Sequence, residues 1–163
     1  MNATDILKYG QLTVLQTIED FPETAWETAG ACGVWSVKDI IAHLASYECV
    51  LEEVLATCMG GPHSSTPYLT RYTDPGSQFN DTEVEKRKNK GIRAVLEELN
   101  DTHAQVMSMV GRIPSETLRQ SGTLPWYGMA YALDDFLVYA YYGHKREHSA
   151  QIAAFRDVLN RLQ

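Results

Sequence analysis

The chain has 163 residues, with 14 basic and 21 acidic side chains and a formal net charge of -7 at pH 7. That length suits one domain with one hydrophobic core, and we expect residues 1–163 to form it. The negative charge argues against a DNA or RNA partner. The sequence shows no signal peptide, no apolar run near the roughly 20 residues of a membrane span, and three cysteines without zinc-module spacing. These features predict a cytoplasmic protein with free thiols and no contact with a membrane.

Two stretches in the first part of the chain carry apolar residues at helical spacing. The apolar positions of the first are Leu7, Val14, Ile18 and Phe21. Gln11 interrupts this line, and we expect Pro22 to end the helix. The second helix begins at Ser36, a typical N-cap residue, and stops at Gly60-Gly61-Pro62. Its inward face carries Ile40, His43, Tyr47, Val50 and Val54.

Two further helices are predicted in the second half of the chain. The third begins between Asn80 and Thr82 and ends near Gly111 and Pro114, and we expect its charged EKRKNK stretch to face solvent. Its apolar positions are Ile92, Val95, Leu99, Val106 and Val110. The fourth follows Gly128 as one continuous stripe. That stripe consists of Leu133, Leu137, Tyr141, His144, His148, Ile152, Phe155 and Leu159.

These four patterns predict an all-α fold, a four-helix bundle, because no strand pattern competes with them. The second and third helices are separated by GGPHSSTPYLTRYTDPGSQFN, a connection of turn-forming residues longer than an antiparallel pair needs. It either crosses over the bundle or covers a site. The TLPWYG stretch before the last helix is a second candidate rim of a site.

Three histidines fall on inward faces of the predicted helices. His144 and His148 are four residues apart, so both rings project from one face and can bind the same metal ion. His43 on the second helix would complete a three-histidine set with an open position, the pattern of catalytic metal sites. The alternative is that each ring is a hydrogen-bonded core residue. His103 has no partner at this spacing, and we treat it as a core or pocket-lining residue.

Two motifs resemble the DinB-like superfamily, which includes YfiT-like proteins. They are WSVKDIIAHL at residues 35–44 and His144-x-x-x-His148-x-x-Gln151-Ile152. The resemblance covers nearly the whole chain and implies an up-down-down-up bundle with a long crossover between helices two and three. It also implies a divalent ion, such as nickel, zinc or iron, held by His43, His144 and His148, and a homodimer. Characterised relatives include thiol-dependent S-transferases and isomerases that use mycothiol or bacillithiol.

Two polar residues share the faces of these histidines. Asp39, four residues before His43, is placed either to accept the free ring N–H of that histidine or to cap the helix together with Ser36. Gln151, three residues after His148, is placed either to orient a ligand or substrate, or to bond to a neighbouring helix. The sequence leaves both choices open.

Three aromatic residues, Tyr47, Tyr141 and Trp126, are candidates for an apolar pocket beside the metal, and their alternative role is simple core packing. Cys32 is the one thiol expected near a loop, although no neighbouring base or cation marks it as a nucleophile.

Our first hypothesis is a metal-dependent enzyme that transfers a low-molecular-weight thiol to an electrophilic small molecule, in stress response or detoxification. One alternative is a metal-dependent hydrolase, in which bound hydroxide replaces thiolate as the nucleophile. The other is a non-catalytic bundle that binds a small molecule or a metal. Fold resemblance alone does not choose among these reactions.

Overall fold

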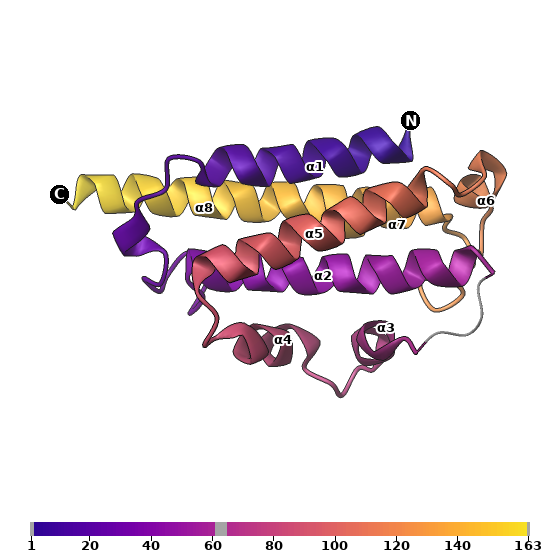
Figure 1. The fold of residues 1–163 in the computed structure, drawn as a ribbon, viewed down its shortest axis with the longest axis horizontal. Helices are drawn as coiled ribbons and strands as arrows, with labels where there is room; N and C mark the ends of the chain where they lie inside the picture. Colours follow the sequence, from indigo (N-terminus) through magenta and orange to yellow (C-terminus); the bar gives the residue numbers. More distant parts are fainter. Residues whose placement is uncertain (1, 61–64, 163) are drawn as a thin grey trace.

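The computed structural model describes residues 2–60 and 65–162, and within them it contains helices and no strand. Four long helical segments run side by side and shorter helices connect them (Figure 1). The long segments are α1 (Ala3–Ile18), α2 (Val37–Cys58), α5 (Ile92–Val110) and a last one formed by α7 (Leu133–Leu137), the π-helical turn η2 (Val138–Gly143) and α8 (His144–Arg161). The short ones are the 3-10 turn η1 (Glu23–Ala25), α3 (Pro67–Thr73), α4 (Phe79–Arg87) and α6 (Ser115–Arg119). The expected all-α bundle is confirmed.

The apolar stripes of the four long segments meet in the core. Helix α2 packs mainly against α5, and α8 packs mainly against α1 (Figure 1). The core side chains that are fully or almost fully buried include Leu7, Val14, Ile40, Leu44, Val50, Val54, Val95, Leu99, Val106, Leu137 and Ile152. Each contributes about 1.5–3 kcal/mol when it leaves water, so these predicted stripes supply much of the stabilisation of the bundle.

The prediction of one long third helix is wrong, because the chain breaks between α4 and α5. Residues 88–91 form a turn, and the extended backbone of Gly91 starts α5 in a new direction. The expectation that the charged stretch faces solvent also fails at Arg87, which is 3% exposed. Its guanidinium donates to Glu83 at 2.9 Å and to Glu98. Two carboxylate partners lower the free-energy cost of burying this cation. The ion cluster links α4 to α5 across the turn between them.

The sequence predicted a connection of turns between the second and third helices. The structure shows that this connection also contains a helix, α3. Pro67 stands at the first position of this helix, where its missing N–H has no intrahelical partner to lose. Gly61 and Pro62, which we expected to stop the second helix, lie outside the described residues; α2 itself ends at Cys58. Figure 1 shows α3 and α4 lying along the outer side of α2.

The last helix is continuous, as predicted, but one of its turns has π geometry. This turn, η2, immediately precedes His144. At Gly143 a Cβ would lie 3.3 Å from the carbonyl oxygen of Val138, which is closer than ordinary packing. Glycine therefore suits this wide turn. π-Helical turns are rare and are found frequently at functional sites.

Candidate metal centre

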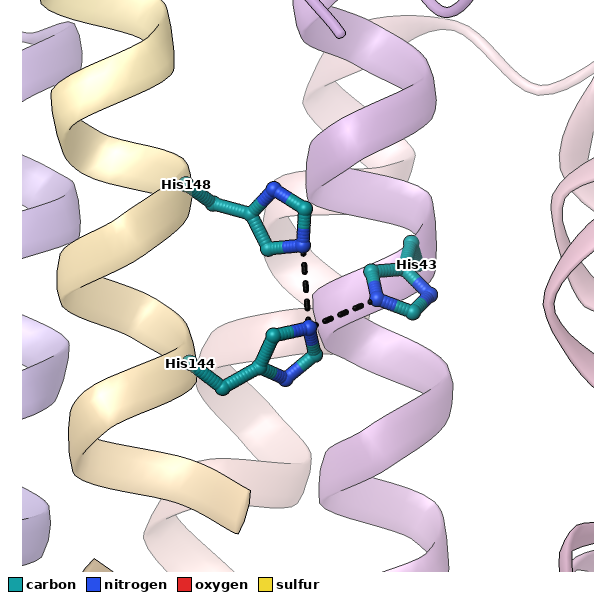
Figure 2. A group of neighbouring side chains, drawn as sticks. All are labelled: His43, His144 and His148. Carbon is teal, nitrogen blue, oxygen red and sulfur yellow. Dashed lines mark hydrogen bonds between the residues drawn. The ribbon is translucent and has the colours of Figure 1, made fainter. Parts of the chain in front are cut away.

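The three predicted histidines meet in the middle of the bundle. His43 comes from α2, while His144 and His148 come from successive turns at the start of α8. Figure 2 shows the three rings pointing toward one another, with Nε2 of His144 2.9 Å from Nε2 of each of the other two. One nitrogen from each ring lies within 4.8 Å of the others. Two nitrogens that share one tetrahedral ion at about 2.0–2.1 Å lie about 3.3–3.4 Å apart, so the rings need only a small outward shift to share an ion.

The rings of α8 are held in one orientation by hydrogen bonds on their outer sides. Nδ1 of His148 donates to Oε1 of Gln151 at 2.8 Å, and the backbone of Ala140 accepts from the ring of His144. Each ring therefore carries its hydrogen away from the centre. The Nε2 atoms that face the centre keep free lone pairs, the form that binds a metal ion. Of the two roles left open for Gln151, the structure shows it bonded to His148.

Asp39 caps its helix and does not support His43. Oδ2 of Asp39 accepts from the backbone N–H of Ser36 at 2.9 Å and from its hydroxyl at 2.8 Å, and Ser36 Oγ accepts in return from the backbone of Asp39. Nδ1 of His43 is buried, and within the described residues it has no hydrogen-bond partner. The ring is instead enclosed by Trp35, with centroids 5.0 Å apart, and by Tyr47.

Burial keeps the triad uncharged at neutral pH. Loss of hydration, together with the smaller effect of the neighbouring imidazoles, lowers the pKa of His43 to about 2 and that of His144 to about 4. The pKa of His148 is also lowered, chiefly by burial. The Nε2 atoms of His144 and His148 lie 2.9 Å apart with no hydrogen between them, because both rings carry their hydrogen on Nδ1, and their lone pairs repel one another. A cation at the centre turns this repulsion into three favourable bonds, so the donor set fits a divalent ion.

Of the three aromatic candidates, only Tyr47 lies against the triad. Its ring centroid is 4.6 Å from that of His43 and 4.5 Å from that of His144. Tyr141 lies beneath it, fully buried, and donates its hydroxyl hydrogen to the carbonyl of Tyr47 at 3.0 Å. Trp126 is more distant and packs on Phe136, with centroids 5.3 Å apart. Tyr141 is therefore a core residue, and Trp126 belongs to an outer rim.

The sequence did not identify Tyr72, which links that rim to the site. This residue of α3 contacts Tyr47 at 5.4 Å between centroids and Trp126 at 6.0 Å. A hollow of about 450 Å³ lies next to the triad. Its lining consists of Tyr47, Tyr72, Tyr139, Ala140, Gly143, His144 and Glu147. The hollow gives a small molecule access to His144, and α3 in the long connection forms part of its wall.

Four further residues lie outside the triad. His103 is 3.0 Å from the carboxylate of Glu48, so it belongs to a separate polar cluster. Cys32 is a half-buried free thiol in the loop before α2. Glu48 and Lys145 were not singled out, although both are buried. The one sequence signal for them was Gln11, the polar residue on an apolar stripe, which accepts a hydrogen bond from Lys145.

Comparison with known proteins agrees with this architecture. None of the helices in the described residues is long and apolar enough to cross a membrane. A crystal structure of a Streptococcus pneumoniae protein superposes with a TM-score of 0.76 over 95% of this chain and 88% of that one, at 8% sequence identity, which shows a shared fold. No curated protein matches the chain significantly. The family profile described as DinB superfamily matches residues 7–152, and the chain therefore belongs to the DinB superfamily.

Proposed function

We propose that the protein is a metal-dependent enzyme, with one divalent ion of nickel, zinc or iron held by His43, His144 and His148. The observation that carries this proposal is the convergence of three neutral imidazoles, two buried and that of His144 half-buried, each with Nε2 directed at a common point. Two of the rings are already oriented by hydrogen bonds to Gln151 and Ala140. Such a site is preorganised, because the ligands need little rearrangement when the ion binds.

The reaction we propose is transfer of a low-molecular-weight thiol to an electrophilic small molecule. A bound divalent ion supplies one function, the lowering of the pKa of a thiol or water. The thiol loses its proton to solvent, its sulfur forms a bond to the electrophilic carbon, and the leaving group departs with the bonding electron pair. Tyr47 and Tyr72 would contact the electrophile, because they form the aromatic wall of the hollow that reaches His144. The cytoplasmic location and the homodimer belong to this proposal and rest on the sequence and the family resemblance.

A product assay separates this proposal from its alternatives. Metal-loaded protein is incubated with a chromogenic aryl halide, with and without a small thiol, beside the variant His144→Ala. Thioether formation that needs metal, thiol and His144 would support the transferase. Hydrolysis of esters or amides in the absence of a thiol would contradict the transferase and support the hydrolase. Ligand-dependent thermal stabilisation without turnover would indicate a binding bundle, since a ligand bound only by the native state raises stability.

A further inference from the structure

A buried polar network crosses the bundle next to the triad and takes one side chain from each long helical segment. The four residues are Gln11 of α1, Glu48 of α2, His103 of α5 and Lys145 of α8. Nζ of Lys145 donates to Oε1 of Glu48 at 2.6 Å and to Oε1 of Gln11 at 2.8 Å. The second carboxylate oxygen of Glu48 lies 3.0 Å from Nδ1 of His103. Lys145 is 2% exposed and Glu48 is fully buried, so this network belongs to the core.

Stability alone does not explain this pair of charges. Taking a carboxylate and an ammonium group out of water costs several kcal/mol for each ion, and apolar residues of similar volume often stabilise a core equally well or better. A buried ion pair differs from apolar packing in being directional, because it is satisfied in only one relative placement of its two helices. Buried polar groups fix helix register in some bundles for this reason.

The pair lies where the metal centre depends most on register. Lys145 directly follows His144 on α8, and Glu48 lies five residues after His43 on α2. Direct packing between α2 and α8 is sparse, because α2 packs mainly on α5 and α8 mainly on α1. The π-helical turn that precedes His144 also interrupts the regular helix at this point. Bridging side chains such as the Glu48–Lys145 pair are therefore among the few direct links between the two ligand-bearing helices.

We propose that Glu48 and Lys145 are positioning residues for the metal centre. Their ion pair sets the axial and rotational register of α8 against α2, so that Nε2 of His144 meets Nε2 of His43 at the distance a shared ion requires. Gln11 accepts a second hydrogen bond from the ammonium group, and His103 contacts the second oxygen of the carboxylate. This inference rests on the proposed metal-binding function and adds the residues that hold its geometry.

The test compares two double variants that each remove one buried ion pair. Glu48→Gln with Lys145→Met removes both charges of the positioning pair and leaves an acceptor for His103. Glu83→Gln with Arg87→Met removes the buried pair at the break between α4 and α5, whose atoms are 2.9 Å apart and which has no contact with the triad. Affinity for Zn²⁺ is measured by competition with a chelator, and ligand geometry by the visible spectrum of the Co²⁺-loaded protein.

We expect the first double variant to bind Zn²⁺ about 10–100-fold more weakly than wild type, the range seen when groups that orient metal ligands are lost. Its Co²⁺ spectrum should also change, while the control variant keeps the affinity and spectrum of wild type. Unchanged affinity in the first variant would overturn the inference. An equal loss in both variants would also overturn it, because that result would mean a general loosening of the bundle.

Two further measurements keep the test decisive. If the first double variant does not fold, Glu48→Asp keeps both charges but shortens the reach of the carboxylate, and it should still alter the Co²⁺ spectrum; an unaltered spectrum would overturn the inference. If wild type binds no metal, the proposed function fails. The positioning role is then tested by nitrogen NMR of the metal-free rings. Shifted signals of His43 and His144 in the first variant alone would support it, and unshifted signals would overturn it.

Discussion

Two buried polar clusters lie side by side in this bundle, and they differ in whether the chain's own atoms complete them. In the Glu48–Lys145 network every charge faces an opposite charge or a hydrogen-bonding partner. Burial raises the pKa of Glu48, but the charge of Lys145 and the hydrogen bond from His103 outweigh it, and the net pKa is lowered. In the histidine triad three uncharged rings turn their Nε2 atoms toward one another, and those of His144 and His148 meet as two lone pairs. The side chains of the first cluster satisfy one another, whereas those of the second could hold a metal cation.

Breaking the complete cluster on one side should have the largest effect on stability. Glu48→Ala leaves the ammonium group of Lys145 buried without its carboxylate, which costs about 3–5 kcal/mol. Chemical denaturation measures this loss in the free energy of unfolding. Removal of both charges in the double variant described above should cost much less. If Glu48→Ala is as stable as wild type, the carboxylate is not paired in the core as described.

Loss of the hydrogen bond behind His148 should weaken metal binding and leave the fold intact. We expect Gln151→Leu to reduce Zn²⁺ affinity about 10–100-fold, because the ring loses the acceptor that fixes its orientation and tautomer. Gln151→Glu is the matched control, since its carboxylate still accepts from Nδ1. Competition titrations of both variants would show the difference. Equal affinities for the two would mean that Gln151 does not orient the ring.

Loss of the cap at Asp39 should lower the stability of the fold and leave metal binding unchanged. Asp39→Ala removes the carboxylate that accepts from Ser36, and losing a capping interaction costs about 1 kcal/mol of stability. Metal affinity should stay at the wild-type value, because Asp39 makes no hydrogen bond to His43 in the structure. A large fall in metal affinity without loss of stability would restore the alternative role, support of the His43 ring.

The smallest effect concerns the acid response of the third buried cluster, around Glu83. Burial raises the pKa of this carboxyl, but hydrogen bonds from Lys86, Arg87 and Arg71 outweigh it and the net pKa is lowered. The folded state then binds fewer protons than the unfolded state below the ordinary pKa of 4.5. The resulting stabilisation is present above that pH and is lost as pH falls through the lowered pKa. The free energy of unfolding of Glu83→Gln should depend less on pH in this window than that of wild type. The same pH dependence in both proteins would contradict the pairing of Glu83 with these cations.

Much of the fold and the triad could be predicted because apolar and histidine spacing reports which face of a helix is buried. The all-α bundle is confirmed, and the structure brings together the three histidines chosen from their spacing; the up-down-down-up order stays a prediction. The prediction failed at charged residues that are buried in ion pairs. Glu48, Lys145 and Arg87 look like surface residues in sequence, and only their partners on other helices make burial possible. The π-helical turn was not predicted, and α3 was missed although Pro67 at its first position is a local sign of a helix start.

The central claim is that the triad binds one metal ion, and elemental analysis of protein without a histidine tag tests it most directly. Wild type is compared with His144→Ala and with His103→Ala, a histidine outside the triad. We predict about one equivalent of nickel, zinc or iron in wild type and in His103→Ala, and almost none in His144→Ala. Absence of metal from wild type even after reconstitution, or the same content in His144→Ala, would contradict the claim.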